Sequence, residues 1–368
     1  MDTQQAAPRA APVTIDWRQI AGLVLLSLKI FLLRFLTLGI YHFWGKTEVR
    51  RKIWSAVHLQ NQPLEYTGTG KELLLGFLIV TFLIIIPIYV AFVGISLYFG
   101  EGHPATVAVQ LILGFAIVFL IGMAQYRARR YRLSRTNWRG IRGGMSGSAL
   151  RYAWTSVWTV LLIPLTLGWI VPWRSVTLQR ILTNETRFGQ MPMRFEGDSG
   201  PLYLPFLGYW LGFIGVYGLA AMLLYQLLGE YTFFQTLDPA PASAPPSLQT
   251  IGIAVFIVLS ALLILSIISA WYTARLYNHF AASTHIDHAR FHLTATPLSL
   301  IGLTIGNFLL SLLTFGIATP IVQTRLARYF VTRLNIEGMI DFDQIAQSQA
   351  SLSRTGEGLA EAFDVDAF

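Results

Sequence analysis

Residues 37–51 read TLGIYHFWGKTEVRR, residues 166–180 read TLGWIVPWRSVTLQR, and residues 314–328 read TFGIATPIVQTRLAR. Each stretch opens with Thr-(Leu/Phe)-Gly at the end of an apolar run and closes on an arginine: Arg51, Arg180 and Arg328. The first two stretches stay aligned further on without a gap, with Gly68 on Gly197. The third stretch loses its similarity to the others soon after its arginine. This pattern predicts a degenerate internal repeat in three copies.

The Thr-(Leu/Phe)-Gly hinge of each copy predicts a break between two helices. Glycine accepts the left-handed conformation that commonly ends a helix. Pro172 and Pro320 then stand where a new helix can begin, whereas the first copy has Phe43 there. Residues 41–59 carry apolar and basic residues at helical spacing, which predicts an amphipathic helix at the membrane surface. Glycine and proline in residues 60–70 indicate a small β-hairpin after it.

Long apolar runs place the chain in a membrane. Hydrophobic residues make up 54% of the 368 residues and charged residues 12%, about half the charged share of soluble domains. Four runs approach or exceed the roughly 20 residues that cross a bilayer: residues 73–99, 105–126, 202–228 and 251–271. Three more, residues 20–44, 149–173 and 298–321, contain the hinges. The predicted fold class is therefore an all-α polytopic membrane protein with hinge helices, transmembrane hairpins and small cytoplasmic β-hairpins.

The chain divides by composition into two tails and one membrane domain. Residues 1–19 have no convincing cleavable signal and are expected to be a disordered tail, as are residues 344–368. Residues 20–343 are expected to form a single integral membrane domain with repeat units at about 20–126, 127–275 and 276–343.

The distribution of arginine predicts the topology. Residues 100–104 and 229–250 contain no Lys or Arg and should face the outside, whereas the arginine-rich residues 126–151, 174–194 and 325–333 should face the cytoplasm. Residues 149–173 then begin and end on one side, so the hinge helices are expected to be re-entrant or interfacial. The alternative is that all hinge helices cross, which gives seven spans and inverted repeats.

The three hinge arginines are the candidate binding residues. Arg51, Arg180 and Arg328 suit a phosphate or carboxylate, since guanidinium groups bind both as a planar fork. The simpler interpretation is that each reaches lipid headgroups and anchors an amphipathic helix. Lys29 and Arg34 are a second candidate, because charge inside an apolar run is costly unless it reaches water.

A histidine group is the one pattern that suggests metal chemistry: His279, His285, His288 and His292, with Asp287. A turn at residues 287–290 would place His285 opposite His292, and two such imidazoles can ligate zinc or copper. The second copy lacks both histidines, so a solvated surface is preferred and no metal or other cofactor is predicted. The chain also has no cysteine, and it lacks the zinc-protease, serine-hydrolase and P-loop motifs. We therefore expect no enzymatic activity.

The strings at residues 37–44, 136–142 and 165–173 resemble the YjgN family, the domain of unknown function 898. This resemblance implies a multi-pass bacterial inner-membrane protein with no established activity and with no catalytic residue to carry over. It also implies a protein partner such as a membrane-linked metallopeptidase. The third copy departs from the pattern, since Ile321 replaces the hinge Trp.

Two classes of function fit these observations. The preferred one is a non-enzymatic membrane scaffold or partner subunit, whose basic cytoplasmic face binds another protein or anionic lipid. The alternative is a transporter or lipid-handling protein with a cavity between the repeats. A net charge of +8 suggests nucleic acid, but the arginines lie between apolar runs and not on a soluble face, so nucleic acid is not an expected partner.

Overall fold

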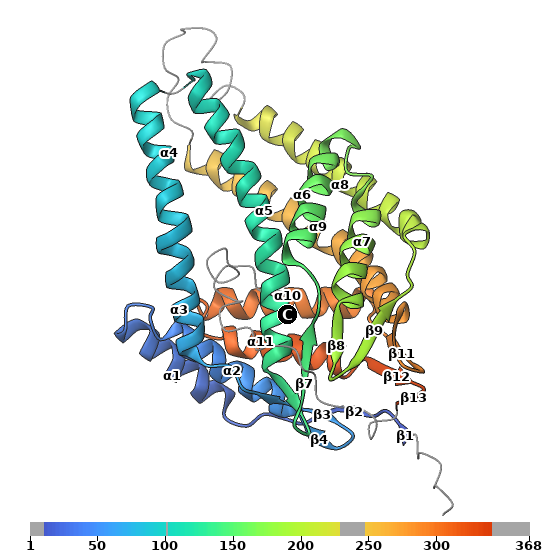
Figure 1. The fold of residues 1–368 in the computed structure, drawn as a ribbon. Coiled ribbons are helices and arrows are strands. Elements are labelled where there is room, and N and C mark those ends of the chain that lie inside the picture. Colours follow the sequence, from blue (N-terminus) through green and yellow to red (C-terminus); the bar gives the residue numbers. More distant parts are fainter. Residues whose placement is uncertain (1–10, 101, 229–246, 341–368) are drawn as a thin grey trace, which may run out of the picture. The chain divides into compact units, whose positions relative to one another are not determined.

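The computed structural model describes residues 11–100, 102–228 and 247–340, which are mostly helical with short strands (Figure 1). The chain forms two compact units. The larger unit contains residues 1–198, 279–294 and 307–368, and the smaller contains residues 199–278 and 295–306.

Four long apolar helices confirm the four predicted runs. They cover Gly70–Phe99 (α3 Gly70–Val80, a π-helical turn Thr81–Ile85 and α4 Ile86–Phe99), Pro104–Arg135 (α5), Gly200–Leu228 (α8) and Leu248–Ala282 (α9). Each exceeds the roughly 20 residues needed to cross a bilayer, and few of its apolar side chains are buried within the protein. Helix α5 continues beyond its apolar part and carries five arginines on its last turns: Arg127, Arg129, Arg130, Arg132 and Arg135.

Three pairs of shorter helices flank the hinges. They are α1 (Leu23–Leu36) with α2 (His42–Ala56), α6 (Ala149–Leu165) with α7 (Val171–Asn184), and α10 (Pro297–Leu313) with α11 (Thr319–Val331). The first members have 14, 17 and 17 residues. At 1.5 Å per residue they are roughly 21 to 26 Å long, which is less than the hydrocarbon thickness of about 30 Å.

All three hinges have the same backbone geometry. The amide of Gly39 donates to the carbonyl of Arg34 and the amide of Leu38 to that of Phe35, and both bonds recur at the same spacing in the other two hinges. This is the Schellman arrangement that ends helices. The prediction that glycine takes the left-handed position is incomplete. Leu38, Leu167 and Phe315 occupy it with φ of 49°, and the glycine that follows each also has positive φ.

An eight-stranded antiparallel sheet corrects the all-α prediction. Its order is β12-β11-β10-β9-β8-β7-β6-β5. The strands are β5 (Glu65–Tyr66), β6 (Thr136–Trp138), β7 (Ile141–Met145), β8 (Thr186–Phe188), β9 (Met191–Phe195), β10 (Thr284–Ile286), β11 (Ala289–Leu293) and β12 (Leu334–Glu337). The hairpin predicted in residues 60–70 does not form as expected, because Gln62–Pro63 pair with Val57–Leu59 and Glu65–Tyr66 pair with β6. The other hairpins of the sheet pair edge to edge, because a hairpin left alone exposes unpaired backbone groups along both strands.

Strand pairing makes the helices from α3 onward leave this sheet and return to it, whereas α1 and α2 lie between the paired strands β2 and β3 of a smaller sheet. Strand β7 pairs with β8, so α6 and α7 leave the sheet and return to it. In the same way, α3 to α5 lie between the paired strands β5 and β6, α8 and α9 between β9 and β10, and α10 and α11 between β11 and β12. Along the sequence, pairs of long helices therefore alternate with hinge pairs.

Two small sheets complete the described residues. Strand β3 (Val57–Leu59) pairs with β2 (Ile15–Trp17) and β4 (Gln62–Pro63), and β1 (Ala11–Pro12) pairs with β13 (Met339–Ile340). Residues 11–17 thus contain strands, so the predicted disordered tail of residues 1–19 is wrong for this part. Residues 1–10 and the predicted tail 344–368 lie outside the described residues.

Candidate functional site

The hinge threonines tie each helix pair together. Thr37 donates its hydroxyl to the carbonyl of Leu33 at 2.7 Å and accepts the amide of Tyr41 at 2.9 Å. Thr166 and Thr314 make the same two bonds to the residues four before and four after. One side chain therefore satisfies a carbonyl at the end of one helix and an amide at the start of the next.

The left-handed hinge residues, here called the hinge tips, are large, apolar and exposed. Leu38, Leu167 and Phe315 expose 94%, 74% and 91% of their surface. An L-residue pays about 1 to 2 kcal/mol in this conformation, and glycine would avoid that cost. The same conformation, which is uncommon for leucine and phenylalanine, therefore recurs at all three hinges.

Two of the three hinge arginines bind the backbone just after a strand. Arg51 donates from Nη2 to the carbonyl of Gly68 at 2.9 Å, and Arg180 donates to the carbonyl of Gly197 at 2.7 Å. At each glycine a Cβ atom would lie within 2.6 Å of the aromatic ring two residues earlier, so a side chain would not fit. The residue that would correspond for Arg328 lies beyond the described residues. All three arginines are exposed on their helices.

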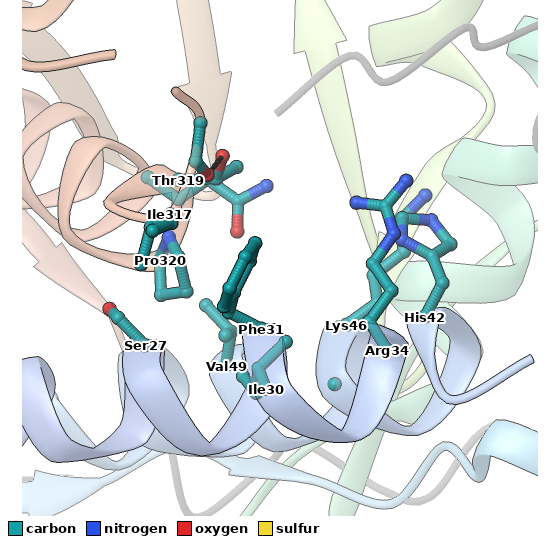
Figure 2. A pocket seen from close by; sticks show the side chains of 13 residues that line it. Ser27, Ile30, Phe31, Arg34, His42, Lys46, Val49, Ile317, Thr319 and Pro320 are labelled. Carbon is teal, nitrogen blue, oxygen red and sulfur yellow. Dashed lines mark hydrogen bonds between the residues drawn. The ribbon is translucent and has the colours of Figure 1, made fainter. Parts of the chain in front are cut away.

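A pocket lies between the first and third hinges (Figure 2). It has a volume of about 90 Å³ and is lined by α1, α2, the third hinge and the start of α11. Figure 2 shows Arg34, His42 and Lys46 together on one side of the view, with Ile317 and Pro320 on the other. The structure therefore brings Arg34, one of the sequence candidates, into a site with two further nitrogen-bearing side chains.

Lys29, the other charged candidate in the first apolar run, has a structural partner. Its ammonium lies 2.9 Å from the Glu48 carboxylate, which also accepts the hydroxyl of Tyr41 at 2.7 Å. The hydrogen bond to Glu48 raises the pKa of Lys29, and burial and the same carboxylate raise the pKa of Tyr41. This ion pair ties α1 to α2, and Glu48 was not expected from the sequence because it stands among basic residues.

Two further carboxylates were also missed by sequence reasoning. Glu72 accepts the hydroxyl of Tyr131 at 2.6 Å and pairs with Arg135 at 2.7 Å, joining α3 to α5. Glu185 is buried at the end of α7, accepts the hydroxyl of Tyr126 at 2.5 Å, and pairs with Arg151. Each carboxylate neutralises an arginine from a segment distant in sequence, which no local pattern signals.

The predicted pairing of His285 with His292 is wrong. The turn is tighter than expected, so His285 lies opposite Arg290 and His292 lies opposite Asn335. Asp287 accepts this tight turn with φ of 52°, a conformation that Asp tolerates better than most residues. In the part of the chain that the structure describes, no three His, Cys, Asp or Glu residues gather as a metal site.

One face of the large sheet carries arginines. Opposed residues share a face, and residues along a strand alternate between faces. The register therefore puts Arg142, Arg187, Arg194 and Arg290 on one face, together with His285 and His292. The acids on that face lie towards its ends at Glu65 and Glu337, with Glu196 just after β9. The opposite face packs against Val13 and Ile340, with Phe188 and Ile286 among its apolar residues.

Comparison with known proteins supports an inner-membrane location. The chain is 32% identical over 141 residues to "Inner membrane protein YjgN" of Salmonella typhimurium. The aligned region covers 37% of this chain and 31% of that relative. The matched region thus spans about a third of the relative's length. No solved structure matches the chain.

Together with its four long apolar helices, this similarity makes the chain a multi-pass inner-membrane protein. The profile of the family described as "Bacterial protein of unknown function (DUF898)" matches residues 25–362. Because that match covers most of the sequence and agrees with the resemblance of the hinge strings, the chain belongs to the DUF898 family.

Proposed function

We propose that this protein is a non-enzymatic scaffold of the inner membrane, which holds an arginine-bearing sheet at the cytoplasmic surface for an acidic segment of a protein partner. The arginine face of the eight-stranded sheet is the observation that carries this proposal. The membrane-linked metallopeptidase implied by the family resemblance stays a prediction for the partner's identity.

In this proposal the helix pairs of the three hinges are related units that enter the membrane without crossing it. Their first helices are too short to cross when straight, and the hinge tips are exposed apolar side chains suited to lipid. The pairing of β7 with β8 supports this, because it brings the two ends of the α6–α7 pair together. This supports the re-entrant arrangement over seven spans.

The arginine face has the charge and the length for an extended acidic segment. Strands lie about 4.8 Å apart, so the arginines from β7 to β11 cover about 19 Å, which is the length of roughly six extended residues. Arg187, Arg194 and Arg290 make no ion pair with any residue in the described ranges and are exposed. Arg187 lies between Gly144 and Pro192, which leave its guanidinium accessible.

The contacts of the hinge arginines argue against the transporter alternative. That alternative needs the hinge arginines to share a cavity, whereas Arg51 donates to the carbonyl of Gly68 and Arg180 to that of Gly197. The pairing of these two guanidinium groups with backbone favours a structural role for them.

Binding of a fluorescent hexaglutamate peptide to the detergent-solubilised, full-length protein tests the scaffold. We expect salt-sensitive binding that weakens about tenfold or more when Arg187, Arg194 and Arg290 are changed together to Gln. The matched control changes three exposed basic residues away from the sheet, Lys52, Arg127 and Arg325, to Gln. Equal loss in both variants, or no binding at low salt, would contradict the proposal. Displacement of the peptide by anionic lipid at equal charge would assign the face to lipid instead.

Topology is tested separately with single cysteines, which is convenient because the chain has none. Gln190→Cys, in the turn between β8 and β9, should react with an impermeant maleimide only after the inner membrane has been permeabilised. Leu38→Cys carrying a fluorophore should be quenched by brominated lipid. Labelling of Gln190→Cys in intact cells, from the outside, would contradict the re-entrant arrangement.

A further inference from the structure

The pocket between the first and third hinges has a cationic end and an apolar wall. Arg34, His42 and Lys46 supply the nitrogen atoms. The wall is apolar and includes Ile30, Phe31, Val49, Ile317 and Pro320. A site of this composition suits a molecule with an anionic group on an apolar body.

The volume of the pocket limits the size of the group that it can hold. About 90 Å³ is room for several water molecules, since a cavity needs roughly 10 to 15 Å³ of such volume to hold one. One phosphate group fits this space, whereas a whole lipid does not. The rest of a lipid would lie along the exposed apolar side of α1, where Leu28, Phe31 and Phe35 expose 51%, 45% and 73% of their surface.

The charges near the pocket favour an anion. Arg34 is exposed and makes no ion pair with any described residue. Glu48, the carboxylate on the facing helix, does not line the pocket and is bound to Lys29 and Tyr41. Helix α11 also begins at this pocket with Thr319 and Pro320, and its dipole adds partial positive charge there.

We propose that this pocket binds the phosphate group of an anionic amphiphile, with Arg34 as the main ligand and Lys46 as a second cation. A guanidinium holds two phosphate oxygens in parallel, which a lysine does not. Two hinge tips adjoin the pocket, because Gly316 lines it directly after Phe315 and Arg34 is one helical turn before Leu38. Lipid at the hinge tips would place a headgroup at the pocket entrance. The pocket's chemistry does not depend on the sheet or its partner.

Binding of dihexanoyl phosphatidic acid to the full-length protein in neutral detergent tests the site, measured by calorimetry. We expect saturable binding that weakens about tenfold in Arg34→Gln, which loses a charged hydrogen bond, and less in Arg34→Lys, which keeps the charge. Arg325→Gln, on the exposed side of α11 and outside the pocket, is the matched control and should bind as the wild type does. Circular dichroism checks that each variant is folded.

Two further probes identify the source of the phosphate. Dihexanoyl glycerol, which lacks phosphate, should not bind. If inorganic phosphate binds as tightly as the lipid and depends on Arg34, the site takes a soluble phosphate; if it binds far more weakly, the ligand is a lipid headgroup. Absence of binding by both phosphate probes, or equal weakening in Arg34→Gln and Arg325→Gln, would overturn the proposal. None of these outcomes depends on whether the sheet binds hexaglutamate.

Discussion

The first and second hinges share a backbone but differ in chemistry. Both have a bridging threonine, an exposed left-handed leucine and a glycine with positive φ. Both also have an arginine that donates to the carbonyl of a glycine two residues after a strand, Arg51 to Gly68 and Arg180 to Gly197. The two hinges therefore share these four features although their sequences otherwise diverge.

The first and second hinges use different side-chain contacts to join their two helices. In the first hinge, Lys29 pairs with Glu48 across α1 and α2. Trp158 stands the same number of residues before its hinge as Lys29 does, and it packs against Trp173 with ring centroids 5.5 Å apart. The pocket cations Arg34 and Lys46 correspond to Ile163 and Ser175. The first hinge therefore has charges that the shared fold does not require, which is why its pocket is the candidate for binding.

The largest expected effect is on the shared arginine bond. Arg51→Ala and Arg180→Ala should each lower the free energy of unfolding by about 2 kcal/mol, because each loses a charged hydrogen bond. Denaturant titration in micelles, followed by circular dichroism, measures this. Lys52→Ala, an exposed neighbour of Arg51, is the control and should change little. Unequal losses in the two hinges would break the comparison.

The second-largest loss of stability is expected at the glycine that both hinges share. Gly168→Ala should cost about 1 to 2 kcal/mol, because its φ of 85° disfavours a side chain. Gly39→Ala should cost the same, since its φ is 92°, although a Cβ there would meet nothing within 4 Å. Gly114→Ala, in open space with ordinary φ inside α5, should instead be neutral or stabilising. A neutral result at Gly168 would mean that the hinge backbone relaxes.

The aromatic contact should matter in the second hinge without depending on salt. Trp158→Ala loses its ring contact with Trp173 and should cost about 1 kcal/mol in the same unfolding assay. Added salt should leave this loss unchanged, since no charge takes part. A loss that shrinks in high salt would show that a charged contact had been overlooked.

The smallest effect is expected for the ion pair of the first hinge. Lys29→Gln should cost less than about 1 kcal/mol, since the lysine is half exposed, and the cost should fall as salt rises. The pKa of Lys29 is raised above 10.5 in the folded state. Its stabilisation is therefore complete below that pH and is lost as the pH rises through the folded value. Glu48→Gln should remove the same salt and pH dependence; a dependence that persists in both variants would contradict this assignment.

Much of the helical fold was predictable from sequence. Run length and hydrophobicity alone identified the four long helices, since the bilayer requires about 20 apolar residues whatever the tertiary contacts. The hinges were recognised from Thr, Gly and Pro, although the left-handed leucine was not expected, because nothing local explains its cost. Among site residues, Arg34 was a candidate, whereas its neighbours His42 and Lys46 were not singled out.

The sequence by itself determined that this chain lies in a membrane and breaks at three hinges, because both properties follow from local composition and from backbone preference. The tertiary structure decided that the hairpins form one sheet with an arginine face, that Arg51 and Arg180 bind backbone, and that Arg34 and Lys46 share a pocket. The strands have only two to five residues and pair with partners far along the chain, such as Glu65 with Asn137. Strands this short carry no periodic signal, so their pairing depends on contacts that the folded chain alone brings together.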